Sequence, residues 1–142
     1  MLEAVRLEAP FRAVVAVPAW RISTSAAYAL IDVGKYGLTR WAPTLRFVSS
    51  LGRQHVSVLQ ALRLGNTFES VLERNRDDFD SLCARMREAR LLQPHLTGSG
   101  SAVFGIVPKG VSIREITGRC SGREPLYEVR SMGRGLHVRM QA

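Results

Sequence analysis

Cysteine is scarce in this sequence, since Cys83 and Cys120 are the only two among 142 residues. Neither belongs to a Cys-x-x-Cys motif, and no accompanying histidine could complete a zinc site around either one. A chain of this length can bury about two thirds of its unfolded surface, so no disulfide or metal is needed to hold the domain together. Both thiols are therefore expected to be free and structural, as in a cytoplasmic protein.

Long apolar runs are also missing from the start of the chain. Glu3, Arg6, Glu8 and Arg12 interrupt the first twenty residues. A signal peptide or a membrane span requires a longer uninterrupted apolar stretch. We therefore expect no contact with a membrane.

Acidic residues are fewer than basic ones, which gives a net charge of +8 and a pI near 10.7. Such an excess suits a partner rich in phosphate. The basic residues are almost all arginines, however, and they are scattered along the chain without interleaved aromatics. This distribution favours a solvated surface, and a nucleic-acid-binding domain is the weaker alternative.

Short apolar patterns indicate an alternation of strands and helices in the first part of the chain. A β-branched run from Phe11, closed by Pro18, predicts a buried strand. A helix is expected from about Ser25 to Val33, with Gly34 after it. Further amphipathic helices are predicted over Trp41–Val48, Val56–Leu62 and from Asp77 or Asp78 to Met86.

The segment Asn66-Thr-Phe-Glu69 has the spacing of a capping box. In that motif the Asn66 side chain accepts a hydrogen bond from the Glu69 amide, and the Glu69 side chain reaches back to the Asn66 amide. We therefore expect a helix to begin here, with Phe68, Val71 and Leu72 on its buried side.

The sequence pattern changes after Pro94, where a Gly/Ser-rich turn separates two short apolar runs. This pattern predicts strand, loop and strand. Ser112 is expected to cap a short helix, and strands are expected over Leu126–Val129 and Gly135–Val138. The element order predicts one α+β domain over residues 1–142, in which helices cover one face of an antiparallel sheet.

The Gly/Ser-rich turn is the most informative local feature. Its two glycines can adopt positive φ angles and expose consecutive amide donors, and its hydroxyls can donate to phosphate oxygens. Taken alone, such a turn is more often a plain connection than an anion site. The residues in question are Thr97, Gly98, Ser99, Gly100 and Ser101.

Three segments together resemble the GHMP superfamily of small-molecule kinases. The stretch Leu96–Phe104, Leu-Thr-Gly-Ser-Gly-Ser-Ala-Val-Phe, resembles the third conserved motif of that family. It looks like the version of the motif found in the branch that phosphorylates a diphosphocytidyl methylerythritol on the route to isoprenoids. Pro18 with Ile22–Tyr28, and Asn66–Glu69, are similar to two further family segments in the same order, so that the resemblance extends from about Phe11 to Val107.

The resemblance implies a ferredoxin-like C-terminal kinase domain and assigns roles to particular residues. The five residues of the Gly/Ser-rich turn would face phosphate and substrate, and Tyr28 would stack on the cytosine ring. Without the resemblance, Tyr28 would be interpreted as an ordinary half-buried helix residue. Thr24 could contact the substrate, but the preference for hydroxyls at helix starts favours a capping role. No catalytic residue and no metal ligand is assigned to this chain.

The sequence also departs from the family pattern. Thr67 replaces an aspartate, and Ala89–His95 replaces a small Gly-Ala segment, so the approach to the Gly/Ser-rich turn is expected to differ. Residues 1–10 are a poorly defined lead-in, and residues 120–142 match the family weakly. His55, His95 and His137 have no carboxylate or cysteine at catalytic or metal-binding spacing and are expected to be structural or exposed.

The family's lysine motif, its Pro-x-x-x-Gly-Leu-Gly-Ser-Ser phosphate loop and its catalytic aspartate do not occur here, and Gly34-Lys35 does not match a Walker motif. The chain therefore corresponds to a C-terminal half that would use ATP only with an N-terminal half, which a separate chain could supply. Mg²⁺ is implied by the family alone. We expect the isolated chain to be inactive, and a stand-alone ligand-binding or interaction domain derived from such a kinase is the main alternative.

Overall fold

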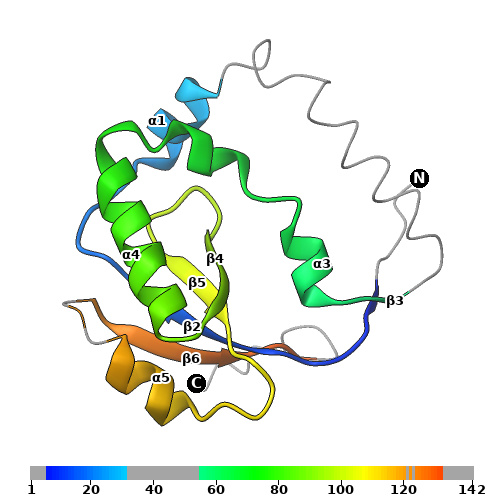
Figure 1. Ribbon diagram of the computed structural model, residues 1–142. Helices are drawn as coiled ribbons and strands as arrows, with labels where there is room; N and C mark the ends of the chain where they lie inside the picture. Colours follow the sequence, from blue (N-terminus) through cyan, green and yellow to red (C-terminus); the bar gives the residue numbers. More distant parts are fainter. Residues whose placement is uncertain (1–5, 32–54, 121, 123, 133–142) are drawn as a thin grey trace, which may run out of the picture.

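A computed structural model of the chain describes residues 6–31, 55–120, 122 and 124–132. Two sequence predictions, the helix over Trp41–Val48 and the strand over Gly135–Val138, lie outside the described residues. The strands of the central sheet and the helices that pack on it lie within them (Figure 1).

Four antiparallel strands form the central sheet. In sheet order they are β4 (Leu92–Leu96), β5 (Val103–Ile106), β2 (Arg12–Ala16) and β6 (Leu126–Arg130). Because β5 lies between β2 and β4, those two strands run in the same direction without touching. This is the split β-α-β topology of a ferredoxin-like fold. The predicted α+β class with an antiparallel sheet is confirmed.

Two helices cover one face of this sheet, α4 (Arg76–Glu88) and α5 (Ile113–Arg119) (Figure 1). From the sheet, Val14 and Val103 enter the core; they meet Leu82 and Met86 of α4 and Ile116 of α5. Each of these five side chains is fully buried. Burying an apolar side chain of this size contributes about 1.5–3 kcal/mol, so this layer accounts for much of the stability.

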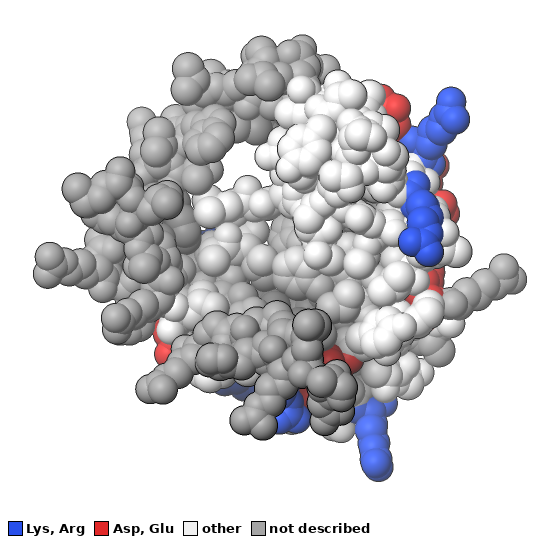
Figure 2. Space-filling model, turned by 180° about the vertical axis from the view of Figure 1, so that it is seen from behind, with Lys and Arg blue, Asp and Glu red and all other residues white. Residues whose placement is uncertain are grey.

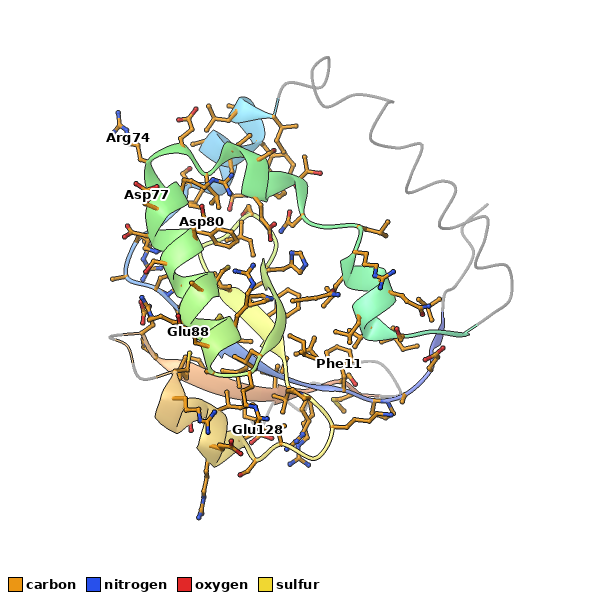
Figure 3. All side chains as sticks on the ribbon, in the orientation of Figure 1. Phe11, Arg74, Asp77, Asp80, Glu88 and Glu128 are labelled. Carbon is orange, nitrogen blue, oxygen red and sulfur yellow. The ribbon has the colours of Figure 1, made fainter. Side chains whose placement is uncertain are left out.

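The charges at the ends of α4 match the helix dipole. Asp77 and Asp78 occupy its first turn, and Arg85 and Arg87 its last. Figure 3 marks Asp77 near the start of the helix and Glu88 at its end. The two adjacent carboxylates are thus explained by their position at the start of the helix.

Several short elements outside the central sheet precede α4, and two of them are two-residue strands that pair in parallel. Their order is β1 (Arg6–Leu7), α1 (Thr24–Leu30), β3 (His55–Val56), α3 (Val58–Leu62) and the 3₁₀ helices η1 (Thr67–Val71) and η2 (Glu73–Asn75). The prediction that the helix begins at Val56 was wrong, because Val56 is buried in β3. Ser57 caps α3 instead, in a capping box with Gln60.

The approach to the Gly/Ser-rich turn is irregular, in keeping with its departure from the family sequence. Arg90 and Gln93 have φ angles of 73° and 44°, and the pairing of β4 with β5 shifts between Leu92 and His95. Pro94 lies within this bulge, on a strand at the edge of the sheet. Proline is tolerated there because an edge position does not need its missing amide donor.

On the described part of the face shown in Figure 2, charged side chains are not gathered into a broad basic patch. The blue lysine and arginine side chains lie toward the rim of the described surface, and its centre is uncharged. Among the described helices, none is both long and apolar enough to cross a membrane.

The two cysteines provide a test of the core. Burial raises the pKa of the Cys83 thiol from 9.0 to about 11, against the opposing effect of Arg87, and burial also raises the pKa of Cys120. Above pH 9 the unfolded chain loses the thiol proton while the folded chain keeps it, so the free energy of unfolding should fall between pH 9 and 11. The contribution of Cys83 is roughly 2–3 kcal/mol.

Urea titrations at closely spaced pH values would measure this slope. Cys83→Ala should remove most of it, whereas Cys120→Ala should leave the Cys83 part in place. An unchanged slope in Cys83→Ala would contradict the assignment. Unfolding should also be cooperative and insensitive to chelator and reductant.

Candidate functional site

The segment Thr97–Ser101, here called the Gly-Ser loop, joins β4 to β5. Gly98 and Gly100 have φ angles of 57° and 101°, which side chains with a Cβ rarely adopt. The Thr97 amide donates to the Ala102 carbonyl at 2.8 Å, and the Gly100 amide donates to the Thr97 carbonyl at 3.1 Å. The loop therefore closes as a tight turn with both predicted glycines at the positions that need them.

The closed turn leaves several donors available. The amides of Gly98, Ser99 and Ser101 make no hydrogen bond to another described residue. The loop residues are half-buried or exposed, so solvent or a ligand can reach them. Backbone amides grouped in such a turn, next to serine and threonine hydroxyls, suit an anion such as phosphate.

Asn66, the residue before η1, is hydrogen-bonded to the Gly-Ser loop and to the residue that precedes it. Its Nδ2 donates to the carbonyls of Leu96 and Gly98, both at 2.8 Å. Its Oδ1 accepts from the Phe68 amide at 3.0 Å. Asn66 thus caps η1 and holds the start of the loop at the same time.

Glu69 does not complete the predicted capping box, and that prediction was wrong. Its Oε1 accepts from the Leu96 amide at 2.8 Å and lies 3.0 Å from Nδ1 of His95. The Leu96 amide, at the end of an edge strand, offers this carboxylate a partner from the sheet. His95 was expected to be structural or exposed, and its contact with Glu69, a residue 26 positions away, could not be seen from the sequence spacing.

Thr24 is brought to the loop from α1. Its Oγ1 lies 3.0 Å from Oγ of Ser99, within hydrogen-bonding distance. The capping role favoured for Thr24 falls instead to Ser23, whose hydroxyl accepts from the Ala26 amide at 3.4 Å. Thr24 is the first residue of the helix, so its hydroxyl is free to point toward the loop.

Tyr28 lies one helical turn after Thr24, so both residues share a face of α1. Its ring packs edge-on against Phe68, with ring centroids 4.9 Å apart and planes at 80°. The side chain is nevertheless 63% exposed. An exposed aromatic face held by a second ring can stack on a planar ligand.

A groove of about 410 Å³ lies beside the loop, between the α3–η1 segment and β4 and β5. Its lining includes Leu62, Phe68, His95 and Phe104. The rings of His95 and Phe104 are 6.4 Å apart and tilted by 42°. The volume falls within the range of small-molecule sites, and the lining is mainly apolar with a few polar groups.

Acidic side chains do not converge at this site. Within the described ranges, no group of three His, Cys, Asp or Glu residues is arranged to hold a metal ion. Among the described hydrogen bonds, the nearest carboxylate contact along the chain is that of Glu69, which accepts from the amide of Leu96, the residue before the loop. The site therefore offers neutral donors to an anion, without a built metal centre.

The contacts of Asn66 should be visible in stability. Asn66→Ala removes the amide group that donates to the carbonyls of Leu96 and Gly98, and it also removes the N-cap of η1. We expect the free energy of unfolding to fall by about 2 kcal/mol. Urea denaturation would measure it, and hydrogen exchange should accelerate at the Gly-Ser loop. Thr67→Ala is the matched control, because the neighbouring Thr67 side chain is exposed and makes no described hydrogen bond. Equal stabilities of the two variants would contradict the role given to Asn66.

The sequence matches no protein-family model and no curated protein. Its fold is similar to that of a solved structure, the crystal structure of 4-(cytidine 5'-diphospho)-2C-methyl-D-erythritol kinase, with a TM-score of 0.63 and 22% sequence identity. The match covers 90% of this chain and 45% of that one, so the chain spans about half the length of the kinase. This similarity confirms the predicted fold.

Proposed function

We propose that this chain is the C-terminal, substrate-facing and phosphate-facing half of a GHMP kinase that acts on 4-(cytidine 5'-diphospho)-2C-methyl-D-erythritol. The observation that carries the proposal is the convergence of α1 and η1 on the Gly-Ser loop. Thr24, Tyr28 and Asn66 are the residues that join them there. The motifs that resemble the family fall together in this one place, and the fold similarity to the named kinase supports the same assignment.

In this proposal the Gly-Ser loop binds phosphate through its amides. Hydroxyls of Thr97, Ser99 and Ser101 add neutral donors, and Thr24 fixes the side chain of Ser99. Phosphoryl transfer depends mainly on positioning and on stabilising negative charge, to which a turn of this kind contributes. The loop supplies donors and orientation but no proton acceptor for the attacking hydroxyl.

Tyr28 is the proposed platform for the cytosine ring. Its exposed face is held in place by Phe68, so stacking requires little additional ordering of the side chain. Stacking of a base on an aromatic side chain contributes about 1–3 kcal/mol. The base would then lie at the η1 side of the loop, with the diphosphate directed toward the amides.

ATP and Mg²⁺ are assigned mainly to residues outside this sequence. The loop fits one end of a phosphate chain, but the described residues do not form a magnesium site. We therefore assign the nucleotide pocket, the metal and the catalytic aspartate to an N-terminal half, encoded in the same chain or a separate one. The complete kinase would act in the cytoplasm on a soluble substrate.

Reconstitution with the N-terminal half of a related kinase tests this function. The isolated chain should give no turnover, whereas the combination should phosphorylate the diphosphocytidyl substrate. In the combination, Tyr28→Ala should raise the substrate KM by about tenfold or more and leave the KM for ATP nearly unchanged, because stacking acts on the cytosine end. Steady-state kinetics with each substrate varied in turn would measure both values.

The matched control is Tyr127→Ala, which removes an exposed tyrosine from β6 instead of α1. Tyr127→Ala should leave both KM values unchanged. If the two variants behaved alike, the cytosine site would have to lie elsewhere. Turnover by the isolated chain, purified free of host kinase, would refute the division between two halves.

A further inference from the structure

The strand β6 lies at an edge of the central sheet. It pairs with β2 on one side, and no other described strand pairs with it. All of its residues after Leu126 are exposed, including the apolar side chains of Tyr127 and Val129. An edge strand with exposed apolar side chains is a site where another strand can add.

The outward-facing backbone groups of β6 can be assigned from its hydrogen bonds with β2. The Ser131 amide donates to the Phe11 carbonyl at 2.9 Å, and the Pro125 carbonyl accepts from the Val17 amide at 3.0 Å. Backbone groups alternate sides along an antiparallel strand, so residues 125, 127, 129 and 131 face β2. Leu126, Glu128 and Arg130 therefore direct their amides and carbonyls away from the sheet.

We propose that the chain forms a two-fold homodimer in which β6 pairs antiparallel with β6 of a second copy, centred on Val129. In this register Glu128 lies opposite the partner's Arg130, and Arg130 lies opposite the partner's Glu128. Both are outward-facing positions, so each such pair exchanges two backbone hydrogen bonds. The result is a continuous eight-stranded sheet with an isologous interface.

Electrostatic repulsion disfavours the two neighbouring registers, which are centred on Glu128 and on Arg130. Centring the pair on Glu128 places two carboxylates directly opposite each other, and centring it on Arg130 does the same to two guanidinium groups. Like charges in opposite positions are destabilising, and opposite charges are stabilising. Glu128 and Arg130 lie on one face of β6, where Nε of Arg130 is 3.5 Å from Oε1 of Glu128. The Arg130 side chain is 73% exposed and Glu128 36%, so both can re-pair across the axis; Figure 3 marks Glu128 on this strand.

The remaining positions of the register are compatible as well. Val129 lies opposite the partner's Val129, and Tyr127 lies opposite the partner's Ser131. Leu126 lies opposite the partner's Met132, and Met132 is 65% exposed in the single chain. Apolar side chains thus meet apolar ones on both sides of the charged pairs, and no position of the register opposes two like charges.

Charge-swap variants test the proposal with the chain as it is. The wild-type chain should show a concentration-dependent monomer–dimer equilibrium in analytical ultracentrifugation. Glu128→Arg alone and Arg130→Glu alone should each raise the dimer dissociation constant at least about tenfold, because every cross-strand pair becomes like-charged. The double variant Glu128→Arg/Arg130→Glu should dimerise like the wild type.

Mixing the two single variants gives the sharpest result. The Glu128→Arg variant carries two arginines on β6, and the Arg130→Glu variant carries two glutamates. A heterodimer of the two restores both opposite-charge pairs, so it should form at the protein concentrations at which the wild type dimerises. Circular dichroism should show the same folded spectrum for all variants, since both side chains are at the surface.

A wild-type chain that stays monomeric up to millimolar concentration would overturn the proposal. Single variants that dimerise as well as the wild type, or a mixture that fails to associate, would overturn it too. None of these outcomes depends on kinase activity, so the dimer and the proposed function can fail separately.

Discussion

Gly100→Val should reduce kcat/KM of the reconstituted kinase by more than about 100-fold. At a φ angle of 101° a β-branched residue is strongly disfavoured. A Cβ at this position would also lie 2.8 Å from Cδ1 of Ile22 and 3.3 Å from Cδ1 of Leu96. To relieve the backbone strain the loop would have to move, and the amides proposed to bind phosphate would move with it.

The matched control is Gly98→Asn in the same loop. Gly98 has a φ angle of 57°, which asparagine tolerates, and a Cβ there would meet no atom within 4 Å. It should therefore lose only a small part of the activity. Ser99→Ala should be intermediate, because it removes one hydroxyl contact, worth roughly 0.5–3 kcal/mol, and keeps the amides. If Gly100→Val kept near wild-type turnover, the loop would have no function beyond joining β4 to β5.

Gly105→Val should destabilise the fold by about 3 kcal/mol and lower the Tm by about 10 °C. Gly105 lies in β5, paired with Val14, and faces the helical layer. A Cβ on it would lie 2.9 Å from Cβ of Leu91 and 3.4 Å from Cε of Met86. The Leu91 atom is close to the backbone and cannot move aside without displacing the chain between α4 and β4.

Gly118→Ala provides the opposite expectation. Gly118 lies inside α5, and a Cβ there would meet nothing within 4 Å. Because alanine favours the helix over glycine, this change should stabilise the protein by about 0.5–1 kcal/mol. Thermal unfolding of both variants would measure the contrast. If Gly105→Val melted at the wild-type temperature, the close packing of Leu91 on β5 would be refuted.

Several elements could be predicted from the sequence because their signals are local. The β-branched run before Pro18 is the strand β2, and the apolar residues of α4 recur at helical spacing between acidic and basic ends. The two glycines of the Gly-Ser loop have the positive φ angles expected of them. In each case neighbouring residues determine the backbone conformation directly.

Predictions based on short-range partners failed where a distant partner was better placed. Asn66 and Glu69 have the spacing of a capping box, but Glu69 bonds to Leu96, 27 positions away. Val56 has helical spacing to Leu59, yet it pairs as a strand with β1. The spacing of polar residues tells which backbone groups they can reach locally, and it says nothing about groups that the fold brings beside them.

The sequence by itself determined the fold class and the position of the Gly-Ser loop. Only the tertiary structure decided what holds that loop. Thr24 meets Ser99 across 75 positions, and Asn66 donates to carbonyls 30 and 32 positions away. Such contacts exist because α1 and η1 pack beside the end of β4, and that packing is set by the burial of the whole core. A local pattern can specify a turn, but the partners of that turn depend on how the rest of the chain closes around it.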